Sequence, residues 1–399
     1  MDANQESPYR IEPTQLVDVS GELLDLLAQL PAAAGRLGAR LHPATAASLA
    51  ALVRVINCYY SNLIEGHNTR PKDIERALVD DFDADGQRRS LQLEALAHIR
   101  IQARIDSDAA DGALGDPAHI DFIQKLHLDF YKDAPESMIL IKGSGRNFMM
   151  VPGEMRNKPE QDVTVGRHIP PSSVMVTRFM QRFAECYSLN NLRPAQRVLA
   201  LPAAHHRFNF IHPFLDGNGR VSRLMSHAMA YHAGIGSHGL WSISRGLARG
   251  LKDRSEYKFM MDHADTPRQG DLDGRGNLST QALVDYSTWF LKVCLDQILF
   301  MESLFDIDTL SGRLRRYVNL KNFRPEATKL LTEVLHRGEI ARGDASIITG
   351  LKERTARDLL GSLLRDGILG AESEKGAVGL RFPVDTREIL FPRLFGEFE

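Results

Sequence analysis

The stretch His212-Pro213-Phe214-Leu215-Asp216-Gly217-Asn218-Gly219-Arg220-Val221-Ser222-Arg223 concentrates more chemically capable side chains than any other twelve residues of the chain. An apolar-patterned segment at 198–211 precedes it and another at 221–231 follows it, so the stretch is predicted to be a loop between two helices. Gly217 and Gly219 permit positive φ and let a ligand approach the main chain closely. The open N-terminus of the second helix, with unpaired N–H groups and the positive end of its dipole, is typical of an anion site.

Side chains in the same loop add groups suited to phosphate chemistry. Arg220 and Arg223 lie on nearly one face of the first turn and can bind phosphate oxygens. Asn218 can donate from its amide, and Asp216 offers a hard oxygen to a phosphate-bound Mg²⁺. His212 is a candidate general base because its unperturbed pKa is near physiological pH. Each residue alone fits a turn, a cap or a structural histidine, but their order predicts a nucleotide site.

The whole stretch resembles the signature of the Fic family, His-x-Phe-x-(Asp or Glu)-Gly-Asn-Gly-Arg-x-x-Arg, at every fixed position. The resemblance implies a mostly helical fold and transfer of AMP from ATP to a hydroxyl side chain of a target protein, with diphosphate leaving. It implies that His212 deprotonates that hydroxyl and that Asp216 holds Mg²⁺. The residues implied to bind the phosphates are Gly217, Asn218, Gly219, Arg220 and Arg223.

A second motif, Ser61-Asn62-Leu63-Ile64-Glu65-Gly66, ends a helix predicted over about 44–66. Ser61 and Glu65 share a face, and Gly66 suits the position just past the helix end. A carboxylate in a last turn faces the negative end of the dipole, so Glu65 would gain from a cation elsewhere. This segment alone indicates that Glu65 is a solvated surface residue. Beside the first motif, the pattern resembles the inhibitory helix of the Fic subclass whose inhibitor is N-terminal, which implies that Glu65 pairs with Arg223 and blocks the terminal phosphate.

Composition bounds the class of protein. The chain has 399 residues, 43% of them hydrophobic, and a formal net charge of −2, so it can build a sizeable core and has no bulk attraction to nucleic acid or anionic membranes. The start has no basic and apolar signal pattern, and no apolar run is long enough to span a bilayer. The three cysteines are far apart and are expected to be reduced. A cytoplasmic protein without membrane contact is the expectation.

Helical periodicity recurs along most of the chain. The predicted helices cover residues 14–30, ended by Pro31, and then 71–78, 89–105, 119–131, 172–188, 194–211, 245–263 and 279–302. The helical period disappears between 138 and 171, where 163–165 alternates, so we predict a short β-hairpin. In the Fic family a hairpin flap here holds the target segment by main-chain pairing. Gly143-Ser144-Gly145 lacks the Gly-Lys-Ser/Thr of a phosphate loop.

Three other polar groups suggest metal sites, and each has a simpler interpretation. The acidic run 80–85 is typical of a solvated turn. His205 and His206 lack the His-Glu-x-x-His pattern of zinc enzymes and are expected in the core, as is His127. The segment 271–277 resembles a calcium loop, but Arg275 stands where a ligand should be and Ala282 where the bidentate Glu should be.

The C-terminal part follows a charged connecting helix at 303–324. Residues 325–384 resemble a winged helix-turn-helix whose recognition helix is 353–365. This part has nine Lys and Arg and nine Asp and Glu, whereas DNA readers are usually basic, so DNA binding is weakly supported. Dimer contact and target recruitment are alternative roles. Residues 385–399 are predicted to be a tail.

These observations combine into one prediction. The chain is expected to be an all-α protein with a β-hairpin flap and a C-terminal winged helix, divided into an N-terminal helical region (1–115), a catalytic core (116–302), the connecting helix, the winged helix and the tail. Its predicted function is autoinhibited transfer of AMP from ATP, with Mg²⁺, to Ser, Thr or Tyr of a target protein or of itself. A homodimer is a further partner hypothesis. The alternative functions are a nucleotide-sensing transcriptional regulator and a Fic enzyme that mainly removes AMP.

Overall fold

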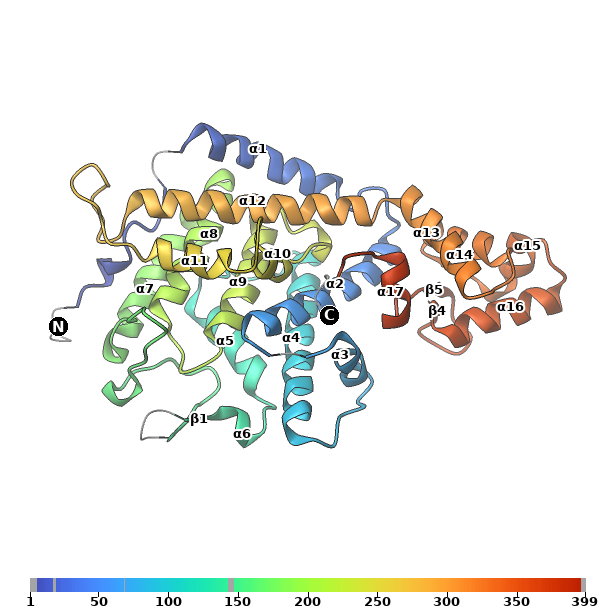
Figure 1. The fold of residues 1–399 in the computed structure, drawn as a ribbon, viewed down its shortest axis with the longest axis horizontal. Helices are drawn as coiled ribbons and strands as arrows, with labels where there is room; N and C mark the ends of the chain where they lie inside the picture. Colours follow the sequence, from blue (N-terminus) through green and yellow to red (C-terminus); the bar gives the residue numbers. More distant parts are fainter. Residues whose placement is uncertain (1–5, 17–18, 68, 143–146, 396–399) are drawn as a thin grey trace. The chain divides into compact units, whose positions relative to one another are not determined.

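The structure, a computed structural model, describes residues 6–16, 19–67, 69–142 and 147–395. It is mostly helical, as predicted (Figure 1). The chain divides into two compact units, the first formed by Met1–Ala34, Asn57–Gly236 and Ser242–Gln297, and the second by Gly35–Ile56, Ser237–Trp241 and Ile298–Glu399. No helix in the described ranges is both long and apolar enough to cross a membrane.

The helices of the first unit surround a central pair. Their bounds are α1 Gly21–Arg36, α2 Pro43–Ile64, α3 Pro71–Leu78, α4 Gly86–Ala110, α5 Ile120–Tyr131, α6 Glu136–Ile139, α7 Val176–Tyr187, α8 Pro194–Ile211, α9 Asn218–His232, α10 Ile243–Arg249, α11 Glu256–Ala264 and α12 Thr280–Leu304, of which α1, α2 and α12 continue into the second unit. Helices α8 and α9 pack along each other, and α4, α5 and α7 pack against this pair. Both central helices are buried along nearly their whole length, so the loop between them is held in the core.

The second unit carries the C-terminal helices and a small sheet. Its elements are α13 Ile307–Leu320, α14 Ala327–Arg337, β3 Glu339–Ile340, α15 Ala345–Thr349, α16 Glu353–Asp366, β4 Leu369–Gly370, β5 Val378–Leu380 and α17 Val384–Leu390. The strand order is β3-β5-β4, all antiparallel. The helix and strand positions of 325–384 match the expected ones apart from the additional β3, and assignment as a winged helix stays a prediction. Helix α17 begins at the last residue of the predicted winged helix and continues into the predicted tail, and it packs against α13.

The predicted bounds of the first helix, 14–30, were wrong at both ends. Pro31 lies inside α1, and the helix begins at Gly21, not at 14. A proline inside a helix removes one hydrogen bond and costs about 3 kcal/mol. Apolar residues on both sides of it, Leu26, Leu30, Ala33 and Ala34, are at most 4% exposed, so burial of this face offsets the loss.

The prediction of one continuous helix at 245–263 was also wrong, because two helices, α10 and α11, cover this stretch. Gly250 has φ 63°, outside the helical region. The carboxylate of Glu256 accepts hydrogen bonds from the N–H groups of Leu251 and Lys252, at 2.6 and 3.2 Å, and so stabilises the turn. Glu256 lies in the first turn of α11 and binds the main chain of the turn that precedes this helix. The apolar periodicity therefore continues through 245–263, although the helix is interrupted there.

A short antiparallel hairpin exists, but at a different place from the alternating stretch. Strands β1, Leu140–Lys142, and β2, Asn147–Met149, pair with Ile141 opposite Phe148. The residues predicted as a strand at 163–165 contribute one isolated bridge, Val165 with His168. The predicted absence of a phosphate loop concerns Gly143-Ser144-Gly145, which lie outside the described residues.

Candidate functional site

The loop between α8 and α9 is built on two residues with positive φ. His212 ends α8 in the left-handed conformation, at φ 51° and ψ 60°. Gly217 precedes α9 at φ 80°, and a Cβ placed there would lie 2.7 Å from the ring of Tyr131. Only glycine therefore fits position 217, for reasons of both backbone conformation and space.

Asn218 holds this loop in shape. Its Oδ1 accepts from the N–H of Phe214 and its Nδ2 donates to the carbonyl of Phe214, both at 2.9 Å. Phe214 is fully buried and stacks on His127 at 4.0 Å, while Nδ1 of His127 accepts from the N–H of Gly153. The Asn218 side chain is thus directed into the loop, whereas the sequence had suggested phosphate as its partner.

Arg223 is held by the end of α2. Its Nε donates to Oγ of Ser61 at 3.0 Å, and its Nη2 donates to the Ser61 carbonyl at 3.2 Å and to Oε1 of Glu65 at 2.6 Å. Arg223 is 1% exposed. A Cβ added at Gly219 would collide with the same Glu65 oxygen, so the carboxylate lies against the N-terminus of α9. An anionic group therefore already occupies the place that the sequence predicted for an anion.

Arg220 has partners that the sequence did not reveal. Its Nη2 lies 3.1 Å from Oε2 of Glu94 on α4, and its Nη1 donates to the hydroxyl of Tyr131 at 3.1 Å. Its Nε is buried and has no hydrogen-bond partner among the described residues. A buried donor of this kind needs an acceptor, which a phosphate oxygen could supply. Glu94 lies in a helix without any local motif, so only the tertiary structure identifies it.

Asp216 suits a metal that arrives with a nucleotide. Its carboxylate is exposed, and Oδ1 accepts from the N–H of Gly217 at 2.7 Å. Among the described residues no group of three or more His, Cys, Asp or Glu side chains could form a metal cage. Mg²⁺ is usually bound by one or two carboxylates together with substrate phosphates, so this donor set fits Mg²⁺.

His212 is neutral at physiological pH. Burial, together with the nearby charge of Arg156 and the ring of His168, lowers its pKa to about 4. The main chain of Asn209 acts in the opposite direction and raises the pKa, but burial outweighs it. A neutral imidazole keeps one ring nitrogen free to act as a base.

His205 and His206 are fully buried, as expected. His205 contacts the hydroxyls of Ser226 and Tyr257, each at 2.8 Å, and His206 lies 3.1 Å from Asp265. These contacts account for both histidines without a metal.

Comparison with known proteins assigns the central region to a family. Residues 117–230, which run from just before α5 to the body of α9, match the Fic/DOC family model. The protein adenylyltransferases Fic of Drosophila erecta and Drosophila melanogaster are each 38% identical to this chain over 82 residues. The match covers 21% of this chain and only 16% of each relative's length.

Solved structures agree in fold. A Fic family protein from Desulfovibrio desulfuricans G20 has a TM-score of 0.50 at 16% identity, covering 92% of this chain and 98% of that one. A Fic domain containing signaling protein from Bacteroides thetaiotaomicron VPI-5482 has a TM-score of 0.50 at 18% identity, covering 71% and 97%. The region 117–230 is a Fic/DOC domain.

Proposed function

We propose that this chain is an autoinhibited protein adenylyltransferase that transfers AMP from ATP to a Ser, Thr or Tyr hydroxyl of a target protein. The name of the Drosophila relatives supports the reaction class, and the complete signature from His212 to Arg223 supports a working site. The target protein supplies the hydroxyl, and the chain itself is a second substrate of the same chemistry.

The proposed reaction follows from the loop geometry. Phosphates of ATP bind at the N-terminus of α9, with Gly217 and Gly219 allowing close approach to main-chain N–H groups. Arg220 and Arg223 neutralise the outer phosphates, and Asp216 would hold the Mg²⁺ that screens their charge. The target hydroxyl oxygen attacks the α-phosphorus, the bond from that phosphorus to the bridging oxygen breaks, and diphosphate leaves. His212 accepts the hydroxyl proton on its free ring nitrogen.

The observation that carries autoinhibition is the position of Glu65. Its carboxylate contacts Arg223 at 2.6 Å and lies against Gly219. A terminal phosphate and this carboxylate are both anions, and both need the same guanidinium and the same helix end. The proposal is that Glu65 excludes the productive position of the nucleotide until α2 moves.

Intact-protein mass spectrometry after incubation with ATP and Mg²⁺ tests the proposal. Glu65→Gly should gain AMP, on itself or on proteins of a lysate, at least about tenfold faster than wild type, the change expected when about 1.4 kcal/mol of competition is removed. The double variant Glu65→Gly and His212→Ala should gain none. Glu374→Gly, which alters an exposed glutamate in the second unit, should behave as wild type. Equal labelling of all four proteins would reject the proposal.

A further inference from the structure

The end of α8 is bound by one short segment of chain. The last carbonyl groups of a helix have no partner inside it. Arg156 donates from Nη2 to the carbonyl of Ile211 at 3.2 Å and from Nε to that of His212 at 2.8 Å, and its own main-chain N–H donates to that of Pro213 at 2.8 Å. His168 contacts the carbonyl of Phe210 at 2.7 Å. Four consecutive carbonyl groups around the candidate base thus have partners in residues 156–168.

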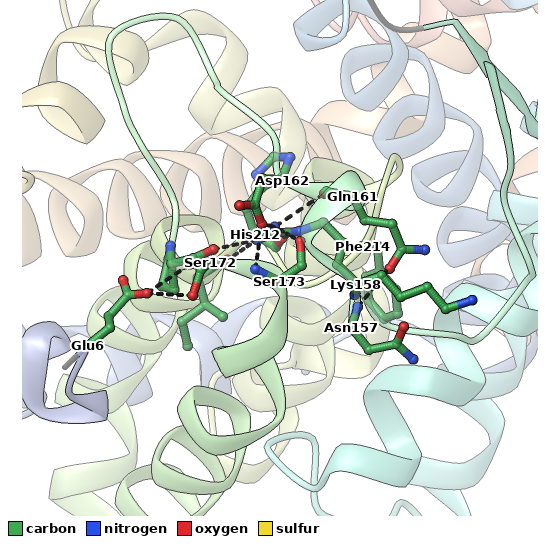
Figure 2. A network of polar contacts seen from close by, with 12 residues as sticks. Glu6, Asn157, Lys158, Gln161, Asp162, Ser172, Ser173, His212 and Phe214 are labelled. Carbon is green, nitrogen blue, oxygen red and sulfur yellow. Dashed lines mark hydrogen bonds and ion pairs between the residues drawn. The ribbon is translucent and has the colours of Figure 1, made fainter. Parts of the chain in front are cut away.

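The Arg156 guanidinium also binds residues at the C-terminal end of the loop 157–171, which follows Arg156 in the chain, and just beyond it. Nη1 donates to Oγ of Ser173 at 2.8 Å, and Nη2 donates to the carbonyl of Pro171 at 3.2 Å. Figure 2 shows Ser172, Ser173, Asp162 and Gln161 gathered beside His212, with Glu6 bonded to Ser172. Arg156 itself is 1% exposed. Arg156 therefore closes the loop 157–171 and fastens it to the end of α8.

His212 needs such a support. A non-glycine residue in the left-handed region costs about 1–2 kcal/mol and persists only where its surroundings hold it. Rotation of the peptide that follows His212 would carry the imidazole away from a bound hydroxyl. A planar guanidinium with several fixed donors can bind the Ile211 and His212 carbonyls together, and its positive charge suits a helix C-terminus.

We propose that Arg156 is a positioning residue for AMP transfer: it fixes the main chain of His212, so that the imidazole faces the reacting hydroxyl, and ties it to the loop 157–171. This inference rests on the proposed function. It concerns the geometry of the base and not the binding of nucleotide. Replacement of Arg156 should therefore lower kcat and leave the KM for ATP nearly unchanged.

The experiment compares variants in the Glu65→Gly background. Arg156→Met should lower kcat about 10- to 100-fold, the range for a displaced catalytic group, with the KM for ATP changed less than about threefold. Arg156→Lys, which keeps the charge but not the fork, should lie between this variant and the parent. Arg167→Met removes an exposed arginine of the same loop and should match the parent. An unchanged kcat in Arg156→Met, or a change confined to KM, would overturn the inference.

A pH profile separates positioning from general loss of structure. The charged or titratable groups that act on the His212 ring are Arg156, His168 and Glu65, of which the last is absent in this background. Loss of the Arg156 charge should move the acid limb of kcat toward neutral pH, because that charge disfavours the imidazolium. Arg156→Lys and Arg167→Met should keep the limb of the parent. A merely structural defect would scale the whole profile without moving the limb, and that result would count against the inference.

Two further measurements keep the test decisive. If Arg156→Met does not fold, Ser173→Ala removes one acceptor of the guanidinium and should lower kcat about two- to fivefold, the loss expected from one hydrogen bond. No loss would then overturn the inference. If the Glu65→Gly parent transfers no AMP, the proposed function fails instead. NMR titration of the His212 ring, identified by its absence in His212→Ala, would still report the inference: its pKa should rise in Arg156→Met, where the positive charge is lost, and an unmoved pKa would overturn it.

Discussion

The carboxylate of Glu65 lies 2.6 Å from Nη2 of Arg223, although 158 positions separate the two residues in the sequence. Burial disfavours the charge on Glu65, but Arg223 and Arg220 outweigh burial and lower its pKa below the ordinary value. Glu65 is therefore ionised throughout the physiological range. The Arg223 guanidinium is 1% exposed and is paired with Glu65, so under the proposed function a nucleotide must compete with that pair.

Replacement of Glu65 should trade stability for nucleotide binding. Glu65→Gly leaves Arg223 with Ser61 as its partner, so the free protein should melt at a lower temperature than wild type. ATP with Mg²⁺ should raise the melting temperature of the variant more than that of wild type, because the ligand restores an anion to the site. Differential scanning fluorimetry with and without ATP measures both shifts. Equal ATP-induced shifts in the two proteins would show that Glu65 does not compete.

The carboxylate of Glu94 is expected to hold the side chain of Arg220 in one orientation. Both side chains are buried, and the carboxylate receives two contacts from Nη2, at 3.2 and 3.1 Å. Glu94→Gln should reduce the free energy of unfolding by up to about 3–5 kcal/mol, the range for breaking a buried pair. In the Glu65→Gly background it should also raise the KM for ATP, because Arg220 loses its fixed orientation. Urea unfolding and initial rates measure the two effects. Glu136→Gln, at an exposed glutamate, should change neither.

The loop and its two helices could be predicted because their signals are local. Apolar periodicity, two glycines and a helix start all fall within one stretch, and α8 and α9 lie where the pattern put them. Glu94 and Arg156 could not be found in this way, since they reach their partners across 126 and 56 positions. Neither belongs to a motif with a spacing rule. What reveals them is burial of a charged side chain, which only packing creates.

The misplaced elements have the same origin. Pro31 ends a helix by local rules, but burial on both sides of it is a tertiary effect. The hairpin was predicted between 138 and 171, where β1 and β2 are found, but the alternating residues 163–165 form only one isolated bridge. Residues near 165 are instead fixed by Arg156 and His168, whose bonds go to the end of α8. Side-chain bonds of this kind leave no periodic trace in the sequence.

Gly217 should tolerate no side chain, and Gly112 provides the matched control. Both have positive φ, 80° and 68°, but a Cβ at Gly112 meets nothing within 4 Å, whereas one at Gly217 meets Tyr131 at 2.7 Å. Gly112→Ala should cost about 1–2 kcal/mol of unfolding free energy from backbone strain alone. Gly217→Ala should cost more and abolish the ATP-induced thermal shift. Urea unfolding compares the two variants, and equal costs would mean that the loop yields around Tyr131.

Acid should destabilise the protein through its buried histidines. His98 and His205 are fully buried, and burial is the main reason that the pKa of each falls to about 3. The folded state keeps these rings neutral, while the unfolded chain binds protons once the pH falls below about 6.5. Stability is therefore lost as the pH falls from about 6.5 toward 3, at about 1.4 kcal/mol per pH unit for each ring. Urea unfolding at several pH values between 7.5 and 5 should show a slope that is shallower by about one proton in His98→Leu. His119→Leu, at a histidine whose side chain is 62% exposed, should keep the wild-type slope, and parallel slopes for all three proteins would contradict the prediction.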